Sequence, residues 1–454
     1  MRHTTMNEIQ NVALRAGIAV VIALLFATGC RPATVSETVD TYTLSSESLT
    51  RPTTAVDRSG ERVYVAWVAK DDSIANVYLA RLDRPGSSTF SHPVRVNDIP
   101  GDAAGHQQAP AQVAVAPDGT VYVAWLTQTD VPGRRFPASD IRLARSTDGG
   151  QTFEPAITVN EDSGFPTGHH FHNLAVGPDG TVYVSWLDTR ERDRAQAAGS
   201  GAATMVHASA QTDHGAHHAG TSGHAGPGRH TPDPKDNLPG TQVRVARSTD
   251  GGRSFGPSVV VAEGTCQCCR TALAISEDGT VYVAWRHIFG GITRDMALAR
   301  SEDGGQTFSK PVRIHADGWM IDGCPHSGPS LTVDRDRNVH VAWYTGAPER
   351  AGLYYTVSRD GGASFEPAQA LAKDVAVAQT SLATDEQGYT WIAWENPGED
   401  CVCLTRADAR GTLHLAAADT LSGSGPALAT ASSTHAMAWR SGKAIQVRVM
   451  QGNM

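Results

Sequence analysis

Cysteine and histidine residues gather in short segments that lie far apart in this sequence. They occupy positions 168–172, 266–270 and 324–326, and a further pair stands at 401 and 403. Thiolates and imidazoles are the side chains that copper and zinc prefer as ligands. The residues that we expect to bind a metal are His169, His170, His172, Cys266, Cys268, Cys269, Cys324, His326, Cys401 and Cys403.

Copper is preferred over zinc as the expected ion, because Met205 and Met320 stand near these segments and reduced copper accepts thiolate and thioether ligands. Disulfides are an equal alternative, since six cysteines follow Cys30 and Cys324 could bridge to one of the three near position 266. One disulfide beside one metal site is a third alternative. No organic cofactor is expected.

A long insertion at about 196–239 is rich in Gly, Ala, Ser and His. Its composition cannot form a packed core, and such histidine-rich tracts commonly bind metal loosely. The alternative is an insertion whose histidines have no function. The auxiliary metal-binding candidates in this segment are His207, His214, His217, His218, His224 and His230.

These residues must be positioned by strands, because one strand-like motif ending in Trp occurs seven times. The copies lie at 63–67, 121–125, 182–186, 281–285, 339–343, 390–394 and 435–439. Each is rich in β-branched and aromatic residues with a period of two, and most follow a tight turn such as 117–119. Each copy is therefore predicted to be the second strand of a hairpin.

The spacing of these copies predicts four-stranded antiparallel units, which are the blades of an all-β propeller. In a propeller, the connections into each first strand and those between the second and third strands open on the same face. The cysteine and histidine segments belong mainly to the first kind of connection. We therefore expect them to line one mouth of the central channel.

A second motif, Ser-x-Asp-x-Gly-x-x-Phe, stands between the third and fourth strands of four units, at 146–153, 248–255, 301–308 and 358–365. In this motif the chain resembles the Asp-box, or BNR-repeat, superfamily of β-propellers that includes the sialidases. Ser and Asp side chains can hydrogen-bond the backbone of such turns, and Gly permits their dihedral angles. The aspartates Asp148, Asp250, Asp303 and Asp360 are accordingly expected to be structural.

The repeats predict seven blades, with the six blades of known sialidases as the alternative. The last unit has only three strands, and the segment 41–44 stands where a fourth strand would precede the first unit. The N-terminal strand is therefore expected to complete the last blade, which removes open sheet edges. A single propeller domain is predicted for 39–454.

The resemblance to sialidases offers a second function, exo-α-sialidase-like glycoside hydrolysis. Those enzymes use three arginines, a Tyr/Glu nucleophile pair and an acidic residue, and their first arginine matches Arg51 here, although the isoleucine that usually follows it is absent. No tyrosine can be assigned as the nucleophile. A third function, that of a non-enzymatic scaffold for protein binding, stays open because fold does not fix function.

The N-terminus resembles the signal of a bacterial lipoprotein. Arg2 and Arg15 precede an apolar run too short to span a bilayer, and 27–30 resembles a lipobox ending in Cys30. We expect 1–29 to be the signal peptide, Cys30 to be lipidated and 30–38 to be a linker. The expected location is the bacterial cell envelope, at the outer membrane, facing the periplasm or the cell surface, with the lipid as membrane anchor.

The charge of the chain bears on its partners. The formal net charge is -9, and no run of lysine or arginine offers a surface for nucleic acid. Nucleic-acid binding is therefore not expected. The function predicted from the sequence is metal handling or redox chemistry in a lipid-anchored propeller, with a metal donor or acceptor protein as its partner.

Overall fold

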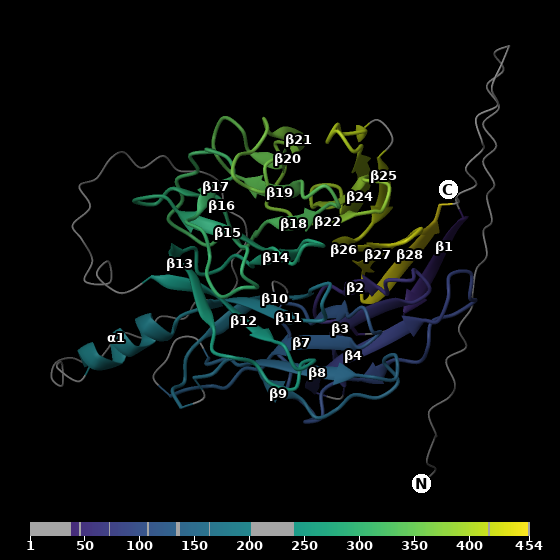
Figure 1. Ribbon diagram of the computed structural model, residues 1–454, viewed down its shortest axis with the longest axis horizontal. Coiled ribbons are helices and arrows are strands. Elements are labelled where there is room, and N and C mark those ends of the chain that lie inside the picture. The colour runs from purple at the N-terminus through teal and green to yellow at the C-terminus, as the bar shows by residue number, and fades with distance from the viewer. Residues whose placement is uncertain are drawn as a thin grey trace, which may run out of the picture.

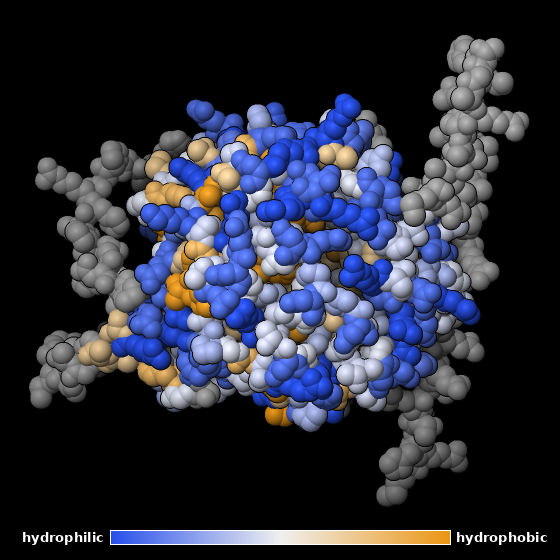
Figure 2. Space-filling view, viewed as in Figure 1, coloured by the Kyte–Doolittle hydropathy of each residue, from blue (hydrophilic) through white to orange (hydrophobic). Residues whose placement is uncertain are grey.

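The computed structural model describes residues 38–452 apart from 45–46, 72, 107–108, 133–136, 163, 201–239 and 416–417. The signal peptide, Cys30, Met205 and the six histidines of the insertion lie outside the described residues. Within them, no helix is long and apolar enough to cross a membrane. The face drawn in Figure 2 is mostly hydrophilic, with small hydrophobic areas.

Four-stranded antiparallel units follow one another along the chain. The first three contain β2 (Thr53–Val56), β3 (Val63–Asp71), β4 (Ile74–Leu82) and β5 (Val94–Arg95); β6 (Gln112–Val115), β7 (Val121–Leu126), β8 (Ile141–Ser146) and β9 (Ile157–Thr158); and β10 (His169–Val176), β11 (Val182–Asp188), β12 (Thr241–Ser248) and β13 (Val259–Thr265). The fourth contains β14 (Ala272–Ile275), β15 (Val281–Ile288), β16 (Arg294–Ser301) and β17 (Val312–Arg313). The third and fourth units share one eight-stranded sheet, because Thr265 pairs with His287.

The remaining units complete the chain. They contain β18 (Ser330–Val333), β19 (Val339–Thr345), β20 (Gly352–Ser358) and β21 (Gln369–Lys373); β22 (Thr380–Thr384), β23 (Thr390–Asn396), β24 (Cys401–Ala407) and β25 (Asp419–Ser422); and β26 (Ser424–Ala431), β27 (Thr434–Ser441) and β28 (Ala444–Gln451) with β1 (Thr38–Leu44). The predicted N-terminal closure is confirmed, since β1 pairs with β28 along its whole length.

The first strands of the units lie side by side in a closed ring, in the order β2, β6, β10, β14, β18, β22, β26 and back to β2. Figure 1 shows most of them gathered around the centre, with the other strands further out. This arrangement confirms the predicted all-β propeller of four-stranded antiparallel blades. The blade number inferred from the repeats stays a prediction.

The second strands form the core because neighbouring units pack against both of their faces. Every residue of β7 and of β11 is buried. The indole N–H of each tryptophan is hydrogen-bonded. Trp125 donates to the Asp102 carbonyl at 2.7 Å, and Trp186 donates to the Asp188 carboxylate at 2.8 Å. A buried indole stabilises a core most when its N–H is paired.

The Ser-x-Asp turns are held by their own side chains and by the preceding unit. In the turn of Asp360, one carboxylate oxygen accepts from the backbone N–H of Ala363 at 3.0 Å and of Ser364 at 2.8 Å. Arg300, from the preceding unit, donates to the Gly361 carbonyl at 2.7 Å. Equivalent arginine bonds join Arg145 to Gly251 and Arg247 to Gly304. The turns therefore connect neighbouring units as well as strands.

One element was not predicted. Helix α1 (Arg190–Ser200) follows β11 and covers the start of the insertion expected from about 196. Its first turn is fixed by a side chain, since the Asp188 carboxylate accepts from the backbone N–H of Arg190 at 2.9 Å. Such N-terminal capping satisfies a donor that has no partner within the helix.

We expect Asp360→Asn to lower the free energy of unfolding at neutral pH by about 1 kcal/mol, because the charged acceptor of the turn is lost. Hydrogen bonds from the Ser364 hydroxyl and backbone lower the pKa of Asp360 to about 2. The stabilisation is therefore present above the unfolded value of about 3.9 and is lost as the pH falls through the folded value. Denaturant unfolding of the wild type and of Asp360→Asn measures this. The difference between their free energies of unfolding should shrink as the pH falls from about 3.9 to about 2. A difference that does not change with pH would contradict this role.

Candidate metal centre

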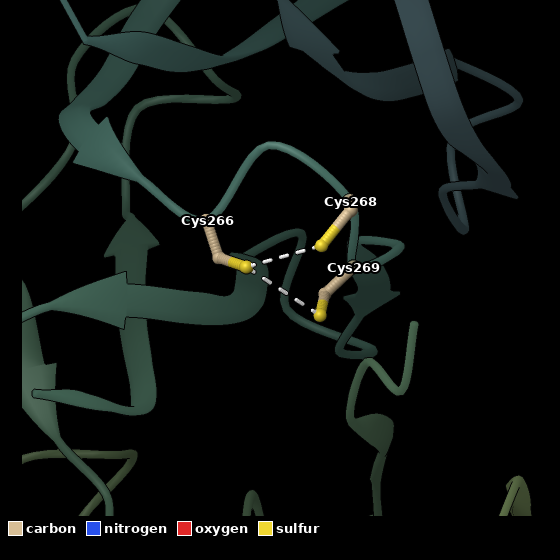
Figure 3. A group of neighbouring side chains, drawn as sticks. All are labelled: Cys266, Cys268 and Cys269. Carbon is tan, nitrogen blue, oxygen red and sulfur yellow. Dashed lines mark hydrogen bonds between the residues drawn. The ribbon is translucent and has the colours of Figure 1, made fainter. Parts of the chain in front are cut away.

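Three cysteine side chains converge in the loop between β13 and β14. Cys266, Cys268 and Cys269 are buried, and their sulfur atoms all lie within 4.8 Å of one another. The Sγ of Cys266 is 3.5 Å from that of Cys268 and 3.7 Å from that of Cys269. In Figure 3 the three sulfur atoms point toward one another. We call these three residues the thiol cluster, and all three are free cysteines.

The sequence of this loop explains the convergence. Cys266 follows directly on β13, and its backbone N–H donates to the Arg286 carbonyl at 3.0 Å, which anchors the loop against β15. The chain then turns back and enters β14 at Ala272, six residues after Cys266. The loop is packed closely against the segment that carries Cys324, because a Cβ added at Gly328 would overlap the Arg270 carbonyl.

Cationic side chains surround the thiol cluster. Arg294 donates from Nη1 to the Cys266 sulfur at 3.3 Å and to the Gly323 carbonyl at 2.6 Å. Hydrogen bonds from Cys268 and Cys269 lower the pKa of the Cys266 thiol, and the charge of Arg294 lowers it further. Burial raises the pKa of Cys269.

Cys324 lies next to this cluster without being part of it. Arg294 joins the two, because its Nη1 donates both to the Cys266 sulfur and to the carbonyl of Gly323, the residue before Cys324. Unlike the clustered cysteines, Cys324 is exposed. The structure therefore brings together three of the six cysteines that follow Cys30, with Cys324 in a neighbouring segment.

The predicted histidine ligands lie elsewhere. His169 contacts Asp162 at 2.9 Å and Asp188 at 3.6 Å, and His172 is buried with its Nε2 at 3.2 Å from the Ala124 carbonyl. Burial lowers the pKa of His172 to about 4. The Nδ1 of His170 is 3.2 Å from the Ser139 hydroxyl. Among the described residues, no histidine nitrogen joins the thiol cluster.

Cys401 and Cys403 also lie apart from the thiol cluster. Both are buried on β24, in an apolar cluster with Trp319 and Trp394. The thiol cluster instead packs with Trp186 and Trp285. The expectation that all ten residues line one rim is therefore not met. His169, His170 and His172 already have partners of their own. Cys401 and Cys403 lie in a separate apolar cluster, and His326 is exposed at the cavity described below.

Asp162, His169 and Asp188 form a second convergence of possible ligand atoms, all within 4.8 Å of one another. Sequence analysis did not identify its two carboxylates. The guanidinium of Arg190 already lies 2.7 Å from Asp188 and 3.3 Å from Asp162. Because a cation from the chain itself occupies this site, we interpret it as an ion-pair network that fixes the start of α1.

A cavity of about 160 Å³ is lined by residues of several units, including Pro325 and His326, which follow Cys324 directly in sequence. Arg51, His326, Gln379, Glu395 and Arg440 are among its lining residues. Burial lowers the pKa of Arg51 to about 10, and Glu395 opposes this shift. Arg270, next to Cys269 in sequence, donates to the Thr380 carbonyl at 2.7 Å. Among the described residues, the Nε atoms of Arg51 and Arg270 have no hydrogen-bond partner.

We expect His169→Gln to lower the free energy of unfolding by about 1–3 kcal/mol, since buried carboxylates lose a partner. Burial lowers the pKa of His169, but the contacts with Asp162 and Asp188 outweigh it and raise the pKa overall. The stabilisation is complete below the unfolded value of about 6.5 and is lost as the pH rises through the folded value. Denaturant unfolding should show that the free energies of unfolding of the wild type and of His169→Gln become more alike at alkaline pH. A larger difference there would contradict the ion pairs assigned to His169.

Comparisons with known proteins concern the fold. No known protein family and no curated protein matches the chain. An ulvan lyase of polysaccharide lyase family 25 has a similar structure, with a TM-score of 0.50 and 9% identity over 89% of this chain and 95% of that one. An α-L-arabinanase of Penicillium chrysogenum has a TM-score of 0.48 and 15% identity, over 75% of this chain and 92% of the arabinanase. The Hadza microbial sialidase Hz136 has a TM-score of 0.47 and 15% identity. The match covers 77% of this chain and only 64% of the sialidase. At these identities the likeness is one of architecture.

Proposed function

We propose that this propeller binds a soft transition-metal ion, copper(I) in the first place, through Cys266, Cys268 and Cys269. The observation that carries the proposal is the convergence of three buried free thiols within 4.8 Å. Single buried thiols are common in protein cores. Three thiols within four residues whose sulfur atoms converge on one position provide the ligands that a soft metal ion needs.

The sulfur separations support this reading over a disulfide. Metal–sulfur bonds of about 2.3 Å place two sulfur ligands of one ion about 3.8 Å apart in tetrahedral geometry and about 4.0 Å apart in trigonal geometry. The separations of 3.5 and 3.7 Å lie just below these values. A disulfide would instead bring two sulfurs to about 2.0 Å. Small side-chain movements would therefore admit an ion.

The number and charge of the ligands favour copper(I) over zinc. Structural zinc sites almost always have four protein ligands, whereas three sulfur atoms converge here. Thiolates bound to a monovalent ion leave excess negative charge. Arg294 donates a hydrogen bond to the Cys266 sulfur, and the positive charge of Arg286 stabilises the thiolate form of Cys269. Both arginines would therefore offset the excess negative charge. Soft thiolates bind both copper(I) and zinc, so the number and charge of the ligands decide between the two ions.

The biological setting forms part of the proposal. The sequence around Cys30 favours a lipid anchor in the bacterial envelope, where the propeller would exchange the ion with a donor or acceptor protein. The histidines of the insertion are proposed as auxiliary ligands that bind metal only loosely, so that copper held after desalting reports on the thiol cluster. Cys324 stands at the surface beside the cluster, and Met320 is 69% exposed in the same connection, so soft ligands are available outside the buried site.

The test compares metal content in full-length chains, reduced and purified without a histidine tag. The wild type should hold about one copper ion per chain after loading with copper(I), as measured by elemental mass spectrometry. Replacing Cys266, Cys268 and Cys269 with Ser should reduce bound copper to background. Replacing Cys401 and Cys403 with Ser is the matched control and should leave it unchanged.

Circular dichroism would confirm that both variants retain the fold. Copper retained by the folded triple variant would overturn the proposal. So would a reduced wild-type chain that binds no copper.

The cavity supports a second candidate, recognition of an anionic sugar such as sialic acid. Arg51 and Arg440 line this cavity, and the buried Nε of Arg51 has no hydrogen-bond partner. A guanidinium group with a free donor favours a carboxylate ligand. Hydrolysis is less well supported, because none of the described residues that line this cavity is a tyrosine.

We expect Arg51→Met to weaken the binding of sialic acid by about 10- to 100-fold, the loss of one charge-assisted hydrogen bond. Isothermal titration calorimetry on both full-length chains measures this. Arg81→Met, which removes an arginine of β4 outside the cavity, is the control. Equal affinity in the wild type and in Arg51→Met, or no binding by the wild type, would rule out this candidate.

A further inference from the structure

The loop that carries the thiol cluster presents one residue to solvent between buried cysteines. Gln267 is exposed, whereas Cys266, Cys268 and Cys269 are 1%, 4% and 1% accessible. Gln267 stands between Cys266 and Cys268 in sequence, so a movement of its backbone moves both neighbouring sulfur atoms. Because the sulfur atoms are covered, an ion or a reagent from solvent reaches them when this part of the loop moves.

Both ends of the loop are held by backbone hydrogen bonds. At its start, the Cys266 N–H donates to the Arg286 carbonyl at 3.0 Å. At its end, the Thr271 N–H donates to the Phe171 carbonyl at 3.3 Å. The part of the loop that can move therefore lies between these anchors, and it includes Gln267.

Helix α1 supplies a contact to this middle part. The guanidinium of Arg192 donates from Nη1 to the side-chain Oε1 of Gln267, although the two residues are 75 positions apart. Arg192 belongs to the first turn of the helix. The helix therefore bonds directly to the residue between Cys266 and Cys268.

The first turn of α1 is itself fixed to the propeller. On one side of Arg192, Arg190 lies 2.7 Å from the Asp188 carboxylate. On the other side, the Asp193 carboxylate accepts from the Thr167 hydroxyl at 2.5 Å. Because residues on both sides of Arg192 are bonded to the propeller, its side chain extends from a fixed support.

We propose that Arg192 is a positioning residue that holds the loop of the thiol cluster closed through Gln267 and so slows the entry and release of the metal. The role in metal exchange rests on the proposed function, whereas the closing of the loop is a property of the chain alone. A hydrogen bond that exists only in the closed loop shifts the population toward that form. Arg192 acts through Gln267, while Arg294 bonds the Cys266 sulfur itself.

The contact affects rates more than the amount of metal bound. The Gln267 amide is not one of the proposed ligands, so its bond to Arg192 is made with and without the ion. An interaction present equally in both states does not shift the binding equilibrium. Entry and release both require the loop to open, and both are therefore slowed by the same factor.

The test measures how fast iodoacetamide alkylates each thiol of the full-length, reduced, metal-free chain, with the sites located by peptide mass spectrometry. Arg192→Met should accelerate alkylation of the three cluster thiols about fivefold. Gln267→Ala removes the same contact without changing the charge, so it should give the same increase, and the double variant should give no more. Arg192→Lys, which can still donate to Gln267, should restore most of the wild-type rate.

Arg194→Met is the matched control. Arg194 lies on the same helix and pairs with Glu191 at the surface, so its loss should leave the alkylation rates unchanged. Cys401 and Cys403 are internal references, because they are buried in a separate apolar cluster. Their alkylation should be the same in all chains, which shows that the loop opens without unfolding of the propeller.

Copper-loaded chains give a second measurement. The wild type and Arg192→Met should hold the same amount of copper(I), but transfer to an excess of the chelator bathocuproine disulfonate should be about fivefold faster from Arg192→Met. If no chain binds copper, the proposed metal site is refuted, and the alkylation rates still decide whether Arg192 closes the loop.

Three results would overturn the inference. The first is equal alkylation of the cluster thiols, or equal copper release, in the wild type and in Arg192→Met. The second is an equal acceleration by Arg194→Met, because the helix in general would then control the loop. The third is an acceleration that extends to Cys401 and Cys403, because the whole propeller would then be opening.

Discussion

Closure of the ring is the constraint on which the rest of this structure depends. The last unit supplies three strands of its own, and β1 pairs with β28 to complete it. This pairing joins residues that are about 400 positions apart, such as Thr43 and Gln446. Because the ring is closed, loops from distant units face a common channel, and Arg51 comes to line one cavity with Arg440.

Two arginines, Arg286 and Arg294, connect the segment around Cys324 to the strands beside the thiol cluster. Arg286 is 1% exposed and donates to the carbonyls of Ser327 at 3.0 Å and Tyr344 at 2.7 Å, so it fixes the loop that follows Cys324. Arg294 bonds the same loop and the Cys266 sulfur. The positive charge of a buried arginine must be balanced by acceptors or by negative charge. Carbonyl oxygens supply part of this balance here, and thiolates would supply the rest. This electrostatic arrangement suits a negatively charged metal–thiolate group better than neutral, inert cysteines.

Much of the architecture could be predicted from the sequence. The repeated Trp-ending strand predicts the units, and the missing strand of the last unit predicts the role of β1. The close spacing of Cys266, Cys268 and Cys269 predicts a local thiol group, because four consecutive residues cannot lie far apart.

The surroundings of the site were harder to predict. The carboxylates that hold His169 come from two separate segments, so no local pattern in the sequence joins them. Arg294 reaches Cys266 from the far end of the β15–β16 hairpin, which only the strand register reveals. Helix α1 was missed because it stands at the edge of a low-complexity insertion, where Asp188 and Arg190 supply the signal for its start.

The central claim is that sulfur atoms of the thiol cluster hold the metal. X-ray absorption spectroscopy of the copper-loaded, full-length chain measures the ligands directly. The account predicts a first shell of sulfur only, about three atoms at about 2.3 Å, as thiolate ligation requires. A first shell dominated by nitrogen or oxygen would contradict it, because the ion would then be held by histidines or carboxylates and not by Cys266, Cys268 and Cys269.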